Sequence, residues 1–423
     1  ITDEIKRRIK LLGTRFNYDV VITEIGGTVG DIESLPYIES VRQLKWELGH
    51  GNSLVIHLTL VPYLAASGEL KTKPTQHSVK ALLENGVQPD VLVLRTEHTL
   101  NKELRKKVAL FCNVELESVI ESIDVKTIYE VPILMQAEKL DETVLRKLNL
   151  PQGPSPELKP WKSMVKKLKN PKRTVKIALV GKYVELQDSY KSIIESLTHA
   201  GATNETKINL NCIHSETIDG DNVGEKLSEY DGIIVAPGFG DRGIEGKILA
   251  VKYARENKIP YLGICLGMQC AVIEFARNIL GFRDAHSTEM TRITSHPVID
   301  LMEEQKGVTE KGGTMRLGGY PCDIKSDTLA FKIYKETHIR ERHRHRYEFN
   351  NDYLAQFESN GMIASGINPD SQLVEIMEQP GHPFFIGVQF HPEYRSTVLN
   401  PHPLFINFIT AAVVFMGKNH AEK

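Results

Sequence analysis

Apolar residues along the first 150 positions follow two spacings in turn. A helical spacing predicts helices over residues 1–12, 34–48, 76–85 and 101–111. Runs of apolar and β-branched residues predict strands over 18–24, 53–61 and 91–95. Strands that alternate with helices are typical of a mostly parallel sheet covered by helices, with functional groups at the carboxyl ends of the strands.

The pattern changes between residues 150 and 173. This stretch is basic in its second half, and prolines interrupt any regular element at Pro151, Pro154, Pro156, Pro160 and Pro171. Proline-rich segments of this kind are typical of linkers, here with room for one short helix. We therefore expect a first α/β domain over residues 1–149, a linker over 150–173 and a second α/β domain over 174–423.

The second half resumes the alternation. Strands are predicted over 175–181 and 232–236, and helices over 189–200, 267–279 and 403–415. A glycine-rich and antiparallel excursion is expected over 291–323. The fold class that follows is α/β, with two three-layer domains whose sheets are mainly parallel.

Composition excludes some classes of protein. The 423 residues carry a formal net charge of −2, which argues against a protein built to bind nucleic acid. No apolar run approaches the roughly 20 residues that cross a bilayer, and no signal peptide is visible. The five cysteines are scattered and odd in number, which favours a reducing cytoplasm over a disulfide framework. We expect a cytoplasmic protein that binds neither membrane nor nucleic acid.

A cysteine lies between two glycines at a predicted strand-to-helix turn. The sequence Gly263-Ile264-Cys265-Leu266-Gly267 follows an apolar run, and glycines allow the strained turn that exposes a nucleophile. A helix N-terminus also favours thiolate over thiol. A lone cysteine near glycines is usually only a small buried residue, so the interpretation depends on partners elsewhere in the chain.

Those partners lie downstream. In an extended segment, His391 and Glu393 face the same side, so the carboxylate can orient the imidazole. The segment Pro237-Gly238-Phe239-Gly240 follows another strand and offers backbone N–H groups. Because proline has no N–H, we expect Gly238 and Leu266 to supply the two oxyanion donors. The set predicts a Cys-His-Glu acyl-transfer site.

Two segments of the first half carry groups suited to nucleotides. Glu24 follows a predicted strand, where a carboxylate can hold Mg²⁺. The run from Lys71 to Gln76 gathers two cations and hydroxyl groups before a helix, a setting that suits a polyphosphate. For both segments a plain solvated loop is the alternative.

From residue 175 onward the chain resembles the class I glutamine amidotransferase domain. The resemblance implies Cys265 as nucleophile, His391 as general base and acid, and Glu393 as its orienting group. Nearly the whole chain resembles the CTP synthase family. The matching motifs are Glu-Ile-Gly-Gly-Thr-Val-Gly-Asp-Ile-Glu at 24–33, Lys-Thr-Lys-Pro-Thr-Gln-His-Ser-Val-Lys at 71–80, Gly-Gly-Thr-Met-Arg-Leu-Gly at 312–318 and Arg-His-Arg-His-Arg-Tyr-Glu at 342–348.

This second resemblance implies roles for further residues. Glu24 would be a magnesium ligand, with Mg²⁺ entering as the partner of ATP. The UTP or CTP site would contain Asp31, Ile32, Glu33, Lys71, Thr72, Lys73, Gln76 and Lys107. The glutamine site would contain Gly238, Leu266, Gln269, Glu289 and Arg346, where a carboxylate suits the α-amino group and a guanidinium the α-carboxylate. The family also implies the substrates UTP, ATP and glutamine, activation by GTP, inhibition by CTP and a homotetramer.

The chain departs from the family pattern in three places. No Gly-rich phosphate loop with its lysine occurs, and the chain opens at Ile1 within a predicted helix, so we expect an amidoligase domain that lacks its N-terminal segment. Pro237 stands where many members have glycine. The stretch before Gly312 is shorter than usual, which leaves the GTP response open.

Other functions are compatible with parts of the pattern. A class I amidotransferase could serve another acceptor such as XMP, although the Lys71 to Gln76 segment speaks against it. A non-catalytic nucleotide-binding scaffold or filament subunit is disfavoured by the complete triad. The basic run from Arg340 to Arg346 would suggest a nucleic-acid patch or a charged surface hairpin, but in this context we expect Arg346 to face the ligand.

Overall fold

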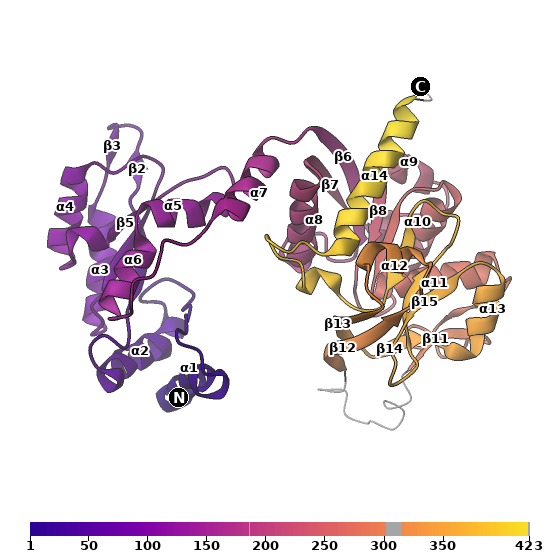
Figure 1. Cartoon of the computed structure of the whole chain (residues 1–423), viewed down its shortest axis with the longest axis horizontal. Helices are drawn as coiled ribbons and strands as arrows, with labels where there is room; N and C mark the ends of the chain where they lie inside the picture. The colour runs from indigo at the N-terminus through magenta and orange to yellow at the C-terminus, as the bar shows by residue number, and fades with distance from the viewer. Residues whose placement is uncertain (186, 302–314, 422–423) are drawn as a thin grey trace. The chain divides into compact units, whose positions relative to one another are not determined.

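The chain divides into two compact units, Ile1–Leu158 and Lys159–Lys423 (Figure 1). A computed structural model describes residues 1–185, 187–301 and 315–421. The division after Leu158 falls inside the predicted linker, whose second part forms helix α7 (Lys159–Lys169). The residues before Gly312, on which the expected GTP response depends, lie outside the described residues.

The first unit is built on a parallel three-stranded sheet with the order β1-β4-β5. Leu92 and Leu94 of β4 pack with α3 and α4 residues on one face of this sheet, whereas Val91 and Val93 pack with Met135 of α5 and Leu140 of α6 on the other. The elements are α1 (Thr2–Phe16), α2 (Leu35–Leu48), β1 (Ile56–Leu60), β2 (Tyr63–Leu64), β3 (Glu69–Leu70), α3 (Lys73–Glu84), β4 (Val91–Thr96), α4 (Lys102–Phe111), β5 (Val119–Ile123), α5 (Val131–Ala137) and α6 (Leu140–Lys147).

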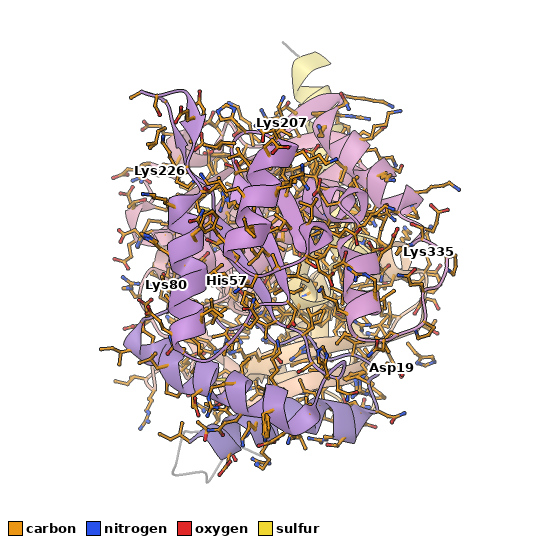
Figure 2. The ribbon with its side chains drawn as sticks, turned by 90° about the vertical axis from the view of Figure 1, so that its left-hand side faces the viewer. Asp19, His57, Lys80, Lys207, Lys226 and Lys335 are labelled. Carbon is orange, nitrogen blue, oxygen red and sulfur yellow. The ribbon has the colours of Figure 1, made fainter. Side chains whose placement is uncertain are left out.

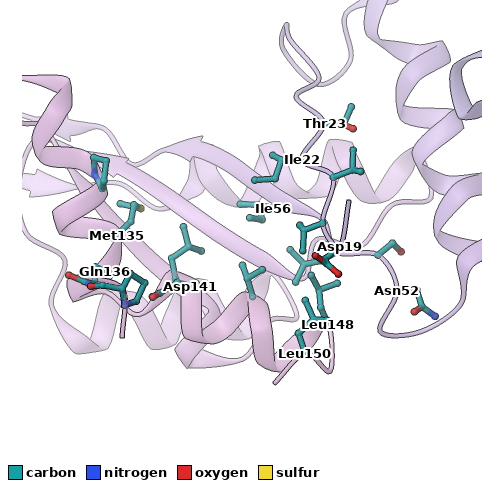
Figure 3. A pocket seen from close by; sticks show the side chains of 18 of the residues that line it. Asp19, Ile22, Thr23, Asn52, Ile56, Met135, Gln136, Asp141, Leu148 and Leu150 are labelled. Carbon is teal, nitrogen blue, oxygen red and sulfur yellow. The ribbon is translucent and has the colours of Figure 1, made fainter. Parts of the chain in front are cut away.

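The predicted strand over residues 18–24 is wrong, because this segment is irregular and joins no sheet. Its apolar residues line a cavity of about 700 Å³ together with side chains of α5 and α6, among them Met135 and Asp141 (Figure 3). Ile22 is 92% exposed. An apolar, β-branched run thus forms no strand where no neighbouring strand pairs with it.

The other elements predicted for this unit appear where the pattern places them, with shifted ends, whereas β2, β3, β5, α5 and α6 were not predicted. Helix α3 begins three residues earlier than expected, at Lys73, because Pro74 occupies its first turn, where a missing N–H costs nothing. His57 of β1 lies against this helix, with Nε2 2.8 Å from the Ser78 hydroxyl (Figure 2). Burial lowers the pKa of His57.

The second unit is built on a nine-stranded sheet with the order β13-β12-β15-β16-β17-β9-β8-β6-β7. The strands from β17 to β7 are parallel, and those from β13 to β16 extend the sheet antiparallel. The strands of this sheet are β6 (Arg173–Gly181), β7 (Thr206–His214), β8 (Gly232–Val235), β9 (Tyr261–Ile264), β12 (Arg316–Ile324), β13 (His338–His345), β15 (Ile363–Ile367), β16 (Val374–Glu378) and β17 (Phe385–Val388).

Helices cover both faces of this sheet. Helices α8, α12 and α14 pack on one face around Leu197, Ile333 and Phe408. Figure 1 shows the yellow α14 beside α8. Helices α10 and α11 pack on the other face around Ile248 and Val272. The helices are α8 (Lys191–Thr203), α9 (Val223–Leu227), α10 (Ile244–Glu256), α11 (Leu266–Asn278), α12 (Leu329–Tyr334), α13 (Leu354–Ser359) and α14 (Pro403–Ala421).

The described part of the excursion predicted over 291–323 contains two strands that the sequence did not separate, β11 (Pro297–Leu301) and most of β12. Strand β11 forms a small sheet with β10 (His286–Ser287) and β14 (Tyr347–Phe349), which lie outside that range. Within the described ranges, no helix has both the length and the apolar character that a bilayer crossing needs.

Candidate active site

Cys265 sits at a strained turn between β9 and α11. Its φ and ψ are +52° and −103°, a combination that costs a residue other than glycine about 1–3 kcal/mol. The Cys265 N–H donates to the Val388 carbonyl of the neighbouring strand β17 over 2.7 Å, which anchors the turn. The side chain is 3% exposed, at the N-terminus of a helix.

The glycines on both sides of Cys265 are required by close packing. A Cβ at Gly267 would lie 2.2 Å from the Val235 carbonyl oxygen of β8, and one at Gly263 would lie 2.7 Å from the Gly267 carbonyl carbon. Any side chain at either position would push α11 off the sheet. The glycines therefore fix the place of the sulfur at the carboxyl end of β9.

His391 and Glu393 follow β17, the strand next to β9. His391 Nδ1 lies 2.8 Å from Glu393 Oε1, and both side chains are buried. Within the described residues, His391 Nε2 has no nitrogen or oxygen partner at hydrogen-bond distance, so it is the ring nitrogen available to Cys265. Burial lowers the pKa of His391, but the Cys265 sulfur and the Glu393 carboxylate outweigh this effect and raise it to about 11. The two neighbouring groups therefore favour the charged form of the imidazole.

A cavity of about 30 Å³ lies over the sulfur. Five residues predicted for the site line it, namely Gly238, Cys265, Gln269, Glu289 and Arg346. Phe239, Met315, His345 and Tyr347 also line it, and the sequence did not single them out. His391, Glu393 and Leu266 are not among the lining residues. A Cβ at Gly238 would lie 3.4 Å from the Leu266 side chain, so the two proposed oxyanion donors are neighbours.

Two buried lysines hold the loop that follows β8. Lys182 Nζ donates to the Phe239 carbonyl over 2.7 Å, and Lys247 Nζ donates to the Ala236 carbonyl over 2.6 Å. Burial lowers the pKa of both amines, that of Lys247 to about 8. Sequence reasoning missed both lysines, because each is an isolated cation in an otherwise ordinary segment. The loop is further tied by the Gly240 N–H, which donates to Glu289 Oε1 over 2.9 Å.

The nucleotide residues predicted in the first unit lie in three segments. Asp31 ends the loop before α2, and Ile32 and Glu33 follow it in a short 3₁₀ helix. All three are exposed, and Asp31 Oδ2 accepts the Thr28 N–H over 3.0 Å. Lys71, Thr72, Lys73 and Gln76 lie at the start of α3, and Lys107 is exposed on α4. Lys71 forms an ion pair with Glu69 over 2.5 Å. None of these residues lines the 700 Å³ cavity.

Glu24 is exposed in the irregular segment before this loop. Among the described residues, it belongs to no group of three side chains that could hold a metal. Mg²⁺ usually needs only one or two carboxylates, because substrate phosphates and water complete its coordination. A single carboxylate at Glu24 is compatible with that arrangement.

Comparison with known proteins covers both units. The family model for the CTP synthase N-terminus matches residues 1–150, and that for class I glutamine amidotransferases matches residues 185–411. The CTP synthase of Flavobacterium johnsoniae is 67% identical over 413 residues, which are 98% of this chain and 77% of the relative. This chain belongs to the CTP synthase family. The CTP synthase of Bacteroides fragilis is 63% identical over 98% of this chain and 77% of its own length.

A solved structure supports the fold of the second unit. The glutaminase domain of the Trypanosoma brucei CTPS, with bound acivicin, is 38% identical and aligns with a TM-score of 0.54. It covers 56% of this chain, and 94% of that domain is matched. The predicted α/β fold class is therefore confirmed. The strained turn at Cys265, called the Cys265 elbow below, lies in the part of the chain that matches the class I glutamine amidotransferase model.

Proposed function

We propose that this protein forms CTP from UTP by ATP-dependent amination, with ammonia that its second unit releases from glutamine. The single observation that carries the proposal is the Cys265 elbow beside the His391–Glu393 pair, in a chain of the CTP synthase family. Among the residues that the structure describes, we find no feature that favours the alternative of an amidotransferase serving XMP.

The geometry supports a thioester route. The Cys265 thiolate attacks the side-chain amide carbon of glutamine, and the carbon–sulfur bond forms while the oxygen takes the negative charge. The N–H groups of Gly238 and Leu266 are the donors we assign to that oxyanion. Charged His391 then gives its proton to the departing nitrogen as the carbon–nitrogen bond breaks. Water, deprotonated by His391, hydrolyses the thioester to glutamate.

Substrate recognition is assigned to side chains around the small cavity. Arg346 offers a guanidinium fork to the α-carboxylate of glutamine, and Glu289 offers a carboxylate to its α-amino group. Glu289 accepts the Gly240 N–H through Oε1, which leaves Oε2 for the substrate. The same contact couples glutamine binding to the loop that carries Gly238.

The nucleotide chemistry is assigned to the first unit. ATP phosphorylates the 4-oxygen of UTP, and ammonia then displaces phosphate at C4. The cationic start of α3 suits the UTP triphosphate, because Lys71 and Lys73 stand at a helix N-terminus. Mg²⁺ would neutralise the ATP phosphates, with Glu24 as its protein ligand. Activation by GTP, inhibition by CTP, a homotetramer and a cytoplasmic location stay predictions of family membership.

Replacement of the nucleophile tests the proposal. Cys265→Ala should abolish glutamate release and glutamine-dependent CTP formation, whereas CTP formation from added ammonia should persist, because only the thioester step needs the sulfur. Cys212→Ala is the matched control, since Cys212 is exposed on β7 and should leave all three rates unchanged. Loss of the ammonia-dependent rate in Cys265→Ala would contradict the division of labour between the units.

A further inference from the structure

A continuous chain of buried hydrogen bonds runs from β13 to the nucleophile. His345 Nδ1 lies 3.1 Å from the Tyr347 carbonyl, and the same carbonyl accepts Gln269 Nε2 over 2.9 Å. Gln269 Nε2 also donates to Gln389 Oε1 over 3.2 Å, and Gln389 Nε2 lies 3.6 Å from the Cys265 sulfur. The four contributing side chains, those of His345, Gln269, Gln389 and Cys265, are each at most 3% exposed, so water reaches these bonds only through the small cavity beside them.

The donors and acceptors along this series of hydrogen bonds determine which way each side-chain amide points. A carbonyl only accepts, so the Tyr347 oxygen must face the NH₂ group of Gln269. Both N–H bonds of Gln269 are then used, one to Tyr347 and one to Gln389. The oxygen of Gln389 must therefore face Gln269, which turns its NH₂ group toward the sulfur. A flipped Gln389 would set two N–H groups against each other and leave the sulfur facing a carbonyl oxygen.

At the other end of this hydrogen-bond series, the contacts of His345 determine the tautomers of His345 and His343. Because His345 Nδ1–H donates to Tyr347, the neutral ring offers Nε2 as an acceptor to His343 Nδ1–H, over 3.0 Å. Burial lowers the pKa of His345 to about 3, which keeps this ring neutral. His343 Nε2 faces Glu375 Oε2 over 3.6 Å.

The same cluster could instead be read as a metal site, because His343, His345 and Glu375 offer three ligand atoms within 4.8 Å of one another. Two observations oppose that interpretation. The Arg316 guanidinium already lies 2.7 Å from Glu375 Oε1, where its charge repels a cation. The two imidazoles are also engaged with each other rather than with a shared centre.

We propose that Gln389 is a further catalytic residue of the glutaminase site, whose side-chain N–H donates to the Cys265 sulfur and stabilises the thiolate. This inference rests on the proposed function of that site. It separates two tasks: His391 supplies the charge and the transferable proton, whereas Gln389 supplies a fixed dipole that needs no proton transfer. His345 and Gln269 act as positioning residues, because they orient the Gln389 amide.

The test is the pH profile of Cys265 alkylation by iodoacetamide, followed on the Cys265 peptide by mass spectrometry. Gln389→Leu should lower the neutral-pH rate about tenfold and move the midpoint to higher pH, because a donor to a charged acceptor is lost. Gln389→Glu should lower the rate further, since a carboxylate accepts and repels the thiolate. Gln379→Leu is the matched control, with a side-chain oxygen that has no hydrogen-bond partner, and should react like the wild type.

Four readouts separate the outcomes. In glutamate release, Gln389→Leu should reduce kcat with little change in the KM for glutamine, and unchanged melting temperatures should show that the variants fold. An unshifted alkylation midpoint in Gln389→Leu, or stoichiometric zinc in the purified wild type, would overturn the inference. A wild type that alkylates normally but releases no glutamate would instead refute the proposed function.

Discussion

Gly267 sets how closely α11 approaches the sheet, and thereby where the nucleophile stands. In Gly267→Ala the new methyl group would meet the Val235 carbonyl at 2.2 Å, and backbone atoms cannot move aside as a flexible side chain can. We expect a loss of roughly 3 kcal/mol in the free energy of unfolding, at the upper end of the cost of overpacking. Urea denaturation followed by circular dichroism measures this change.

Gly417→Ala provides the control at the same scale. Gly417 is also helical, in α14, but a Cβ there meets nothing within 4 Å. Alanine should stabilise this helix by up to about 1 kcal/mol, because glycine loses more backbone entropy on folding. Equal effects of the two substitutions would show that the close contact at Gly267 relaxes at little cost.

The residues of the site differ in how well the sequence alone could predict their roles. Cys265 carries a local signature, because flanking glycines and an apolar run reveal a strand-to-helix turn without knowledge of the rest. Gln389 and Lys247 carry none, since their roles come from contacts with segments distant in sequence. His391 and Glu393 stand between these cases: their spacing suggests a pair, but only the sheet order brings β17 beside β9.

Helices α10 and α11 are joined by two ion pairs of different burial. Arg255 of α10 binds Glu274 of α11 through two hydrogen bonds of 2.9 and 2.8 Å, with side chains 10% and 0% exposed. Glu274→Gln would leave the buried guanidinium with only the half-exposed Glu256 carboxylate, at 3.3 Å, as a countercharge. We expect a loss of about 3 kcal/mol in the free energy of unfolding, measured by urea titration.

The second ion pair joins the same two helices, but its carboxylate lies on α10 and its guanidinium on α11. It gives the matched comparison. Glu245 of α10 pairs with Arg277 of α11 over 2.9 Å, but the glutamate side chain is 66% exposed. Water and salt screen such a pair, so Glu245→Gln should cost less than about 1 kcal/mol. A larger loss from Glu245→Gln than from Glu274→Gln would refute the assignment of stability to the buried pair.

Helices and strands were predictable from the sequence where an apolar pattern coincides with a local capping or turn residue. Asn101 caps α4 through the Leu104 N–H, and this helix appears where it was expected. Residues 18–24 show the limit, because an apolar β-branched run becomes a strand only when a neighbour offers hydrogen bonds. The sequence predicted an antiparallel stretch over residues 291–323, but not that β12 pairs with β13 and β15 in the large sheet, because strand pairing is not encoded locally.

At the scale of the whole molecule, each unit has its own core. The apolar clusters of the first unit contain no residue beyond Leu140, and those of the second begin at Val175. Between α6, which ends at Lys147, and α7, which begins at Lys159, the chain forms no helix or strand. Residues 151–157 are all exposed, so this stretch offers a protease an accessible backbone.

Brief digestion with subtilisin should therefore cut first between residues 151 and 158 and leave two fragments that resist further cleavage. Gly153 and Ser155 are small residues in open segments, whereas cleavage inside either sheet would require unfolding of a packed core. Intact-mass spectrometry over a time course identifies the sites. First cuts within β4 or β9, or loss of one fragment as fast as it appears, would mean that the two cores do not stand as independent folding units.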